Sequence, residues 1–329
     1  MGDHTVQIST IQQAIELACR APSLHNSQPW RWVARCERVE LFADPARVLR
    51  SADRMGREAI LSCGIVLDHF RAAMASLGWA ARIERFPDHR DIEHLASITF
   101  EPKSSVSDRE RRCADAILVR RTDRLPFAEP PGWDSFEQYL RREVATEVTR
   151  LDVLTEDQRP QLVEATQLTE SLRLYDTSYH NELYWWSGEF ESVEGIPFDS
   201  LLSVEENERV DIARRFPPVS HRQRRISVGQ DKARIVVLST YDGTRDSVLR
   251  CGETLSAVLL EATMTGFATC PLTHLTELAV SRNLVAALTG ADTIPQVLIR
   301  IGLAPALEPV AAPTPRRPLT EVLTIDDDP

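Results

Sequence analysis

The apolar positions along the chain recur at two spacings, one typical of helices and one typical of strands. Residues 8–20 carry Ile8, Ile11 and Ile15 at helical spacing. This helix is expected to end before Pro22, because the residue preceding a proline is pushed out of the α region. Strands are predicted near 31–35, 38–43, 80–86, 95–101, 148–154, 233–240 and 295–302, and further helices from about residue 156 and over 179–186.

Two long segments, 56–78 and 251–266, are apolar on most sides, which is typical of helices in the middle of a domain. Their sequences are CGIVLDHFRAAMASLGWA from residue 63 and CGETLSAVLLEATMTGFA from residue 251, and both fit the frame C-G-x2-L-x10-G-aromatic-A. Two buried helices can match to this extent by chance. Alternatively, the chain is a duplicated domain whose two copies carry different insertions.

The charged stretch 102–112 is expected to separate a first part, 1–108, from a second part, 109–329. Within the second part, residues 187–230 show no strong periodicity. A stretch of this length without periodicity is usually a lid or a disordered insertion. A proline-rich arm, LEPVAAPTPRRPLTEVL, closes the chain.

Composition limits the classes of protein that fit. The 329 residues are 43% hydrophobic and 26% charged, which indicates a globular chain of about two domains. A net charge of −11 argues against a dominant basic face for nucleic acid. Lys103 and Lys232 are the only lysines, so anion binding falls mainly to arginine, whose planar fork grips phosphate.

The six cysteines form no C-x-x-C pair, and no Cys/His cluster has zinc spacing, so no metal site is expected. The first ten residues contain no apolar signal region, and no run reaches 18 apolar residues. We therefore expect a reduced, cytoplasmic protein without a membrane segment. The sequence contains no G-x-G-x-x-G, Walker A or G-x-S-x-G motif, so it gives no support for a Rossmann fold, a P-loop NTPase or an α/β-hydrolase.

Three polar segments could carry chemistry. Residues 21–30, APSLHNSQPW, hold short hydrogen-bonding side chains between two prolines and form either a packed loop or a claw for a planar ligand. Residues 120–124, RRTDR, are either a solvated charge run or a phosphate site. Residues 314–318, TPRRP, are either a tail or a second basic clamp on the same phosphate. A lone histidine such as His25 or His274 is more often a loop or core residue than a catalyst.

These segments together resemble the nitroreductase-like flavoprotein superfamily and, within it, the dormancy-associated Acg subfamily of NAD(P)H nitroreductases. The resemblance runs nearly end to end and is weakest over 187–230. It implies an α+β fold in which two subunits place FMN at their interface. Here the P-S-x-x-N-x-Q-P-W segment occurs once, in the first part, and the arginine segments occur once, in the second. The resemblance therefore implies two fused copies, a pseudo-dimer around the central helices with one FMN site, and a monomeric chain.

The resemblance also assigns roles to individual residues. Phosphate and ribityl contacts are expected from the arginine segment and the closing arginines, and Arg124 is expected to reach toward the flavin ring. Residues of the first part are expected to contact FMN from the other side of the interface between the two fused copies. The loop after the second central helix is expected to approach flavin N5. The implied FMN-binding residues are Ser23, Asn26, Gln28, Pro29, Trp30, Arg31, Trp32, Arg120, Arg121, Thr122, Arg124, Pro271, Leu272, Thr273, Arg316 and Arg317.

The implied reaction is ping-pong transfer of hydride from NAD(P)H to FMN and then to a nitro or quinone-like acceptor, without an acid or base side chain. A competing hypothesis is a flavin-binding protein without turnover, with 187–230 as a lid closed over FMN. A third is a structural protein that kept the fold and lost the cofactor. No nucleic-acid or membrane partner is expected.

Overall fold

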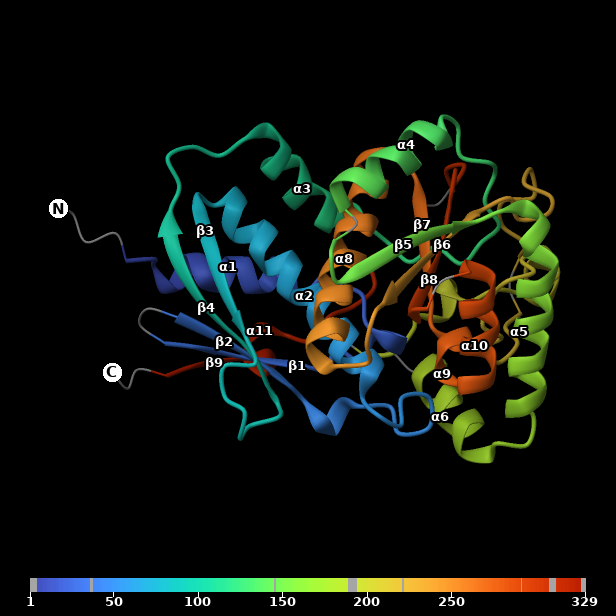
Figure 1. Cartoon of the computed structure of the whole chain (residues 1–329), viewed down its shortest axis with the longest axis horizontal. Coiled ribbons are helices and arrows are strands. Elements are labelled where there is room, and N and C mark those ends of the chain that lie inside the picture. The colour runs from blue at the N-terminus through green and yellow to red at the C-terminus, as the bar shows by residue number, and fades with distance from the viewer. Residues whose placement is uncertain are drawn as a thin grey trace.

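The computed structural model describes residues 5–35, 38–144, 146–188, 194–220, 222–290, 292–307 and 312–326. Two sheets lie on either side of a pair of long helices, α2 (Arg57–Ser76) and α8 (Arg245–Met264), as Figure 1 shows. Helices α5 (Arg159–Arg173), α9 (His274–Glu277) and α10 (Ala279–Thr289) cover the outer side of the second sheet, whereas α1 (Ile8–Ala18) packs against α2 on the inner side of the first. The arrangement is an α+β fold around two central helices, as predicted.

The first sheet has the order β3-β4-β2-β1-β9, and its first four strands come from the first third of the chain. The fifth strand, β9, comes from the C-terminal arm and pairs with β1 in parallel. The elements of this half are α1 (Ile8–Ala18), β1 (Trp30–Ala34), β2 (Arg38–Ala43), β3 (Trp79–Arg85), β4 (His94–Pro102), α11 (Leu319–Val322) and β9 (Leu323–Ile325).

The second sheet has the order β5-β6-β8-β7 and is wholly antiparallel. The elements of this half are α3 (Asp108–Val119), α4 (Trp133–Tyr139), β5 (Thr149–Leu154), α5 (Arg159–Arg173), α6 (Thr177–Ser187), α7 (Val204–Asn207), β6 (Arg234–Thr240), β7 (Ala268–Leu272), α9 (His274–Glu277), α10 (Ala279–Thr289) and β8 (Ile294–Gly302). Apart from α7 and a single 3-10 turn, the described part of 187–230 is irregular.

The predicted strands are confirmed to within a residue or two, but three elements differ from the prediction. Helix α8 begins at Arg245, ahead of the predicted residue 251. Residues 271 and 272, predicted as a loop, end strand β7, which lies at the edge of its sheet, where a proline removes no needed donor. Strand β9 has only three residues beside a proline-rich stretch, and its partner is nearly 300 residues away in sequence, so local pattern could not predict it.

The two sheets share one connectivity. In the first, β1, β2, α2, β3 and β4 follow one another and the strands lie in the order β1-β2-β4-β3. In the second, β5, β6, α8, β7 and β8 do the same, in the order β5-β6-β8-β7. Each sheet also has a register shift where its second strand meets its fourth, between Leu41 and Phe42 and between Leu238 and Ser239. A β-bulge at the same place in both sheets is a positional feature that chance rarely repeats.

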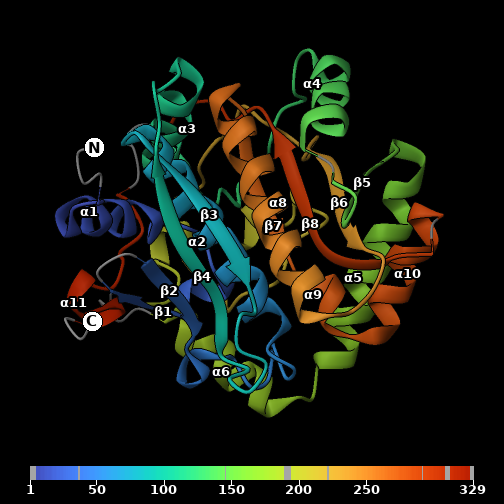
Figure 2. The ribbon, with the colours of Figure 1, turned by 60° about the vertical axis from the view of Figure 1, so that its left-hand side comes forward.

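Helices α2 and α8 pack against each other between the sheets (Figure 2), and a glycine on each permits the contact. A Cβ atom built on Gly64 would lie 2.1 Å from the carbonyl oxygen of Leu249, and one on Gly252 would lie 2.1 Å from that of Leu61. The two contacts are reciprocal, as at an isologous interface. Only glycine allows two backbones to approach this closely.

Helix α2 is the one described helix that is long and apolar enough to cross a membrane. Of its most apolar 18-residue window, 83% is buried inside the molecule, which is the situation of a core helix.

Substitution of Gly252 by alanine is expected to destabilise the fold by about 3 kcal/mol, because the new methyl group would overlap backbone atoms that cannot move aside alone. Urea unfolding of the purified variant measures this loss. Gly229 is exposed with nothing within 4 Å of an added Cβ, so Gly229→Ala is the control and should change stability by less than about 0.5 kcal/mol. Equal effects at the two positions would contradict the proposed helix contact.

Candidate functional site

Two adjoining pockets lie where the first part of the chain meets the second. The larger chamber has a volume of about 820 Å³ and the basic chamber one of about 530 Å³. They share a wall made of Pro22, Ser23, Thr122 and Arg124. The two sequence segments predicted to form one site, 21–30 and 120–124, are therefore brought together by the fold.

The basic chamber gathers arginines that have no acidic partner. Arg20, Arg120, Arg124 and Arg316 line it, and within the described ranges none of the four forms an ion pair with a carboxylate. The buried Arg120 donates from Nη2 to the carbonyl oxygen of Arg20 at 3.3 Å, while its Nε and Nη1 have no partner among the described residues. Positive charge without a counterion in a buried position indicates an anion site.

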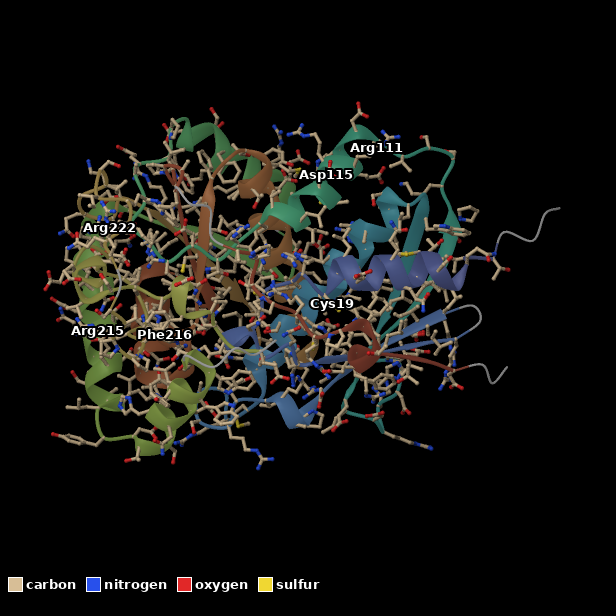
Figure 3. The ribbon with its side chains drawn as sticks, turned by 180° about the vertical axis from the view of Figure 1, so that it is seen from behind. Cys19, Arg111, Asp115, Arg215, Phe216 and Arg222 are labelled. Carbon is tan, nitrogen blue, oxygen red and sulfur yellow. The ribbon has the colours of Figure 1, made fainter. Side chains whose placement is uncertain are left out.

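The pKa values of these arginines reflect the same excess of positive charge over negative charge. Burial, together with the charges of Arg316 and Arg20, lowers the pKa of Arg120 to about 9. Burial and the charge of Arg20 lower the pKa of Arg316 to about 10. Arg316 is held by carbonyl oxygens, those of Cys19 and Arg20, each at 2.9 Å. Cys19, whose carbonyl oxygen accepts from Arg316, is labelled near the middle of the molecule in Figure 3.

The wall from the first part of the chain is a strained turn. His25, Asn26 and Gln28 all have positive φ angles, between 49° and 59°, which side chains larger than glycine rarely adopt. The Ser23 hydroxyl oxygen accepts a hydrogen bond from the Gln28 backbone N–H at 2.9 Å and closes the turn. The Asn26 amide donates to the carbonyl oxygen of Pro315 at 3.2 Å, and its own Oδ1 is buried without a partner. Backbone strain and an orphaned polar atom at one turn are typical of a ligand-binding wall.

The wall from the second part follows directly after α3. Thr122 forms a parallel bridge with Thr269, and the Asp123 backbone N–H donates to the Thr269 carbonyl oxygen at 2.9 Å. This places the arginine segment beside β7, whose end contributes Pro271, Leu272 and Thr273 to the larger chamber. The predicted segment and the predicted loop thus lie in one wall.

A buried ion pair fixes the arginine segment from within. Arg300 is fully buried and donates to Asp231, and from Nη1 and Nη2 to the carbonyl oxygens of Arg124 and Leu125 at 3.2 and 3.1 Å. Asp231 accepts from the Phe127 backbone N–H at 2.8 Å. Burial raises the pKa of Asp231, but the Arg300 charge and these hydrogen bonds outweigh it, so its pKa lies below the usual value.

The larger chamber combines a mostly apolar wall with buried polar and charged groups, among them two histidines. His25 and His274 line it, and none of their four ring nitrogens has a partner within the described structure. Burial and the charge of Arg214 hold the pKa of His25 well below its usual value and lower that of His274 to about 3. Burial raises the pKa of Glu58, against the opposing charge of Arg57. Both imidazoles are therefore neutral at physiological pH and offer one donor and one acceptor each.

The segment predicted as a lid contributes to both chambers. Its residues Leu202, Ala213, Arg214 and Phe216 line the larger chamber, and Ile196, Pro197 and Ser200 line the basic one. Phe216, labelled in Figure 3, lies edge-on to His25 at 5.7 Å between ring centroids and beneath the Arg124 guanidinium at 5.3 Å. Arg214 is anchored to Glu277 and to the Tyr179 hydroxyl at 2.7 Å.

Ten of the predicted residues line the chambers: Ser23, Asn26, Arg120, Arg121, Thr122, Arg124, Pro271, Leu272, Thr273 and Arg316. The other six do not. Trp30 and Trp32 are fully buried in the core, and Arg31, on the opposite face of the same strand, stacks on Phe42. Gln28 accepts from the Arg317 backbone N–H at 2.9 Å, and Pro29 accepts from the Cys63 thiol. The side chain of Arg317 points to Glu321. Gln28 and Arg317 therefore attach the C-terminal arm to the first part of the chain and do not line the site.

Sequence reasoning did not assign Arg20, Arg214 or the two histidines to the site. Arg20 directly precedes the predicted 21–30 segment, and that adjacency was an available signal. No such signal was available for the two histidines. They are distinguished by ring nitrogens that are buried without a hydrogen-bond partner in the described structure, and this property arises only in the folded chain.

His274 should make the protein acid-sensitive. Its folded pKa of about 3 lies below the unfolded value near 6.5, so the unfolded state binds the proton first and stability falls as pH drops below about 6.5. Each such group contributes a slope of about 1.4 kcal/mol per pH unit near pH 5. We expect His274→Gln to remove that slope from urea unfolding between pH 6 and 4. The exposed His89 is the control, and an unchanged slope in His274→Gln would contradict the assignment.

Comparison with known proteins gives close relatives. The chain is 57% identical over 325 residues to "Putative NAD(P)H nitroreductase acg" of Mycobacterium tuberculosis, covering 99% of this chain and 98% of that protein. It is 50% identical over 323 residues to an uncharacterized protein of the same organism, covering 97% and 94% of the two chains. It is 38% identical over 327 residues to a further M. tuberculosis protein also named an NAD(P)H nitroreductase, covering 98% and 93%.

No family model matches the chain. Solved structures are more distant. The FMN-dependent nitroreductase NfnB of Mycobacterium smegmatis, in complex with NADPH, aligns with a TM-score of 0.39 at 15% identity over 65% of this chain and 97% of its own. The structure of "a putative nitroreductase" from Anabaena variabilis aligns with a TM-score of 0.43 at 12% identity over 90% of this chain and 73% of its own. The sequence matches extend over nearly the full length of the chain, which therefore belongs to the Acg family of nitroreductase-like proteins.

Proposed function

We propose that the chain is an FMN-binding oxidoreductase that takes hydride from NAD(P)H and passes electrons to a nitro or quinone-like acceptor. One observation carries the proposal: the basic chamber is lined by four arginines that form no ion pair with any carboxylate in the described part of the chain, and it adjoins a larger chamber with a mostly apolar wall. The names of two relatives, NAD(P)H nitroreductases, agree with it.

The residues present fit FMN. A phosphate needs cations and hydrogen-bond donors. Arg20, Arg120 and the amide of Asn26 can supply both in the basic chamber, and Arg316, whose guanidinium donates to backbone carbonyl oxygens, adds positive charge. A planar, largely apolar ring needs an adjoining space with a mostly apolar wall, which the larger chamber offers through residues such as Leu61, Ile65 and Leu272. The unpaired Nε and Nη1 of Arg120 are the donors that such a phosphate would satisfy.

When bound, FMN supplies the hydride and electron chemistry that no protein side chain can perform. The chain binds, orients and shields it. Arg124 belongs to the wall shared by the two chambers, so its guanidinium would stabilise negative charge that develops on a reduced ring and raise its potential. Pro271 to Thr273 and the insertion would exclude water from the ring.

We infer further that two ancestral subunits are fused, as 1–108 and 109–329, and that one site survives. The shared sheet connectivity, the matching bulges and the reciprocal glycine contact support this inference. In the frame of the repeat, Arg85 corresponds to Thr273 and Glu253 to Ile65, and both of these counterparts line the larger chamber. Arg85 and Glu253 instead form an ion pair at 2.6 Å, which fills the place a second chamber would need.

A second candidate function is flavin binding without turnover. The observation that favours it is the contribution of the insertion to both chambers, because residues such as Phe216 would cover a ring and keep a nicotinamide from stacking on it.

Arg316 and Arg317 offer a matched pair of variants. Arg316→Gln should weaken FMN binding about 10- to 100-fold, or about 1.4–2.7 kcal/mol, because it removes a buried positive charge beside the phosphate and the bonds that hold the arm at Cys19 and Arg20. Arg317→Gln should change it less than threefold, because Arg317 faces Gln28 and Glu321. Fluorescence titration with FMN gives both affinities and should yield one FMN per chain. Equal losses in the two variants, or two FMN per chain, would overturn the site assignment.

Anaerobic mixing with excess NADPH separates the two functions. If the protein is an oxidoreductase, NADPH should reduce the flavin, and the absorbance of oxidised flavin in the FMN-loaded protein should disappear. Persistent oxidised flavin in the wild type, with bleaching restored in Phe216→Ala, would support sequestration instead. Flavin that stays oxidised in both proteins would contradict hydride transfer from NADPH altogether.

A further inference from the structure

The arginine segment contains a carboxylate at its centre. Asp123 lies between Thr122 and Arg124, both of which line the basic chamber, while Asp123 itself does not. Its negative charge acts on Arg124, whose pKa it raises in opposition to the larger effect of burial. A carboxylate that turned into the chamber would neutralise an arginine there and compete with any bound anion. The position of Asp123 therefore bears directly on how strongly the chamber attracts phosphate.

Arg225 holds this carboxylate. Its Nη1 donates to Asp123 Oδ1 at 3.2 Å and its Nη2 to Oδ2 at 2.7 Å, a bidentate pair. Only 3% of the Arg225 side chain is exposed. The same guanidinium donates to the carbonyl oxygens of Pro126 and Pro305, at 3.3 and 3.2 Å. Bidentate arginine–carboxylate pairs combine strong attraction with a defined geometry, so Asp123 is fixed in one orientation.

Arg225 comes from the insertion, 187–230, and not from the framework of the second sheet. Its backbone has a φ of 51°, in the left-handed region that is unfavourable for arginine. Arg209 stabilises this turn by donating from Nη1 to the carbonyl oxygens of Arg225 and Val228, at 2.9 and 2.7 Å. The insertion thus presents a single buried cation to the outer side of the segment whose inner side faces the basic chamber.

We propose that Arg225 keeps Asp123 turned away from the basic chamber and thereby couples the seating of the insertion to phosphate affinity. With Arg225 in place, the four arginines of the chamber keep their uncompensated charge. When Arg225 leaves with the insertion, Asp123 retains the hydrogen bond from the Leu125 backbone N–H at 3.0 Å but loses its cation, and its charge then competes with an anion bound beside Arg124. Arg225 is a positioning residue in this proposal, which rests on the proposed binding of FMN. Coupling is reciprocal, so a bound phosphate also favours the seated insertion.

The rival explanation is that Arg225 only anchors the insertion. Four variants separate the two: Arg225→Gln, Asp123→Asn, the double variant, and Arg209→Gln as the matched control. Arg209→Gln removes an arginine that supports the same turn but does not touch Asp123. The measurement is the dissociation constant of FMN and of riboflavin, which lacks the phosphate, by flavin fluorescence at low salt.

We expect Arg225→Gln to weaken FMN binding at least tenfold and riboflavin binding less than twofold. The double variant should return to within about threefold of the wild type, since the released carboxylate is gone. Arg209→Gln should weaken FMN binding less than threefold. The proposal is overturned if the double variant shows no recovery, if Arg209→Gln matches Arg225→Gln and adding Asp123→Asn does not restore it, or if riboflavin is weakened as much as FMN.

Asp123→Asn keeps the result decisive if Arg225→Gln does not fold. It leaves Arg225 in place and removes the competing charge, so it should bind FMN at least as tightly as the wild type, and a tenfold loss would overturn the proposal. If the wild type binds no FMN, the proposed function fails on its own. The coupling is then measured with inorganic phosphate, whose increase of the thermal unfolding temperature should disappear in Arg225→Gln and return in the double variant.

Discussion

The close packing of α2 against α8 is the contact on which the remaining structure depends. Gly64 and Gly252 let each helix meet a backbone carbonyl of the other, and both helices carry a sheet on their outer side. The larger chamber is lined by Leu61, Ser62 and Ile65 from α2 and by Leu255 from α8. A greater distance between the helices would therefore separate the chamber walls as well as the sheets. The same contact that closes the core sets the size of the site.

The basic chamber shows how a fold can hold cations together without neutralising them. Carbonyl oxygens at the end of α1 satisfy Arg316, and one of them also accepts from Arg120. Acidic groups nearby are engaged elsewhere: Asp231 by Arg300 and Asp123 by Arg225. Carbonyl dipoles orient the arginines but cancel little of their charge, so the attraction for an anion remains. The surrounding buried ion pairs give the walls their rigidity.

Much of the fold followed from local pattern. The strands of both sheets were predicted because their apolar runs are short and bounded, and the central helices because they are apolar on most sides. The elements that were missed depend on distant partners. Strand β7 contains a proline that only an edge position tolerates, and β9 exists because β1 offers it a free edge. Within the site, alternation along β1 placed Trp30 and Trp32 in the core, although the motif resemblance had grouped them with the ligand-binding residues.

The sequence by itself determined which chemical groups are present: an arginine-rich segment, a polar turn between two prolines, two helices with a common frame, and almost no lysine. Only the tertiary structure decided which of those groups meet. It directed Arg316 into the basic chamber and Arg317 away from it, left the rings of His25 and His274 without partners, and paired Asp123 with a residue about 100 positions later. Residue type sets the chemistry that a side chain can perform. Direction, burial and the presence of a counterion arise only when distant segments pack together.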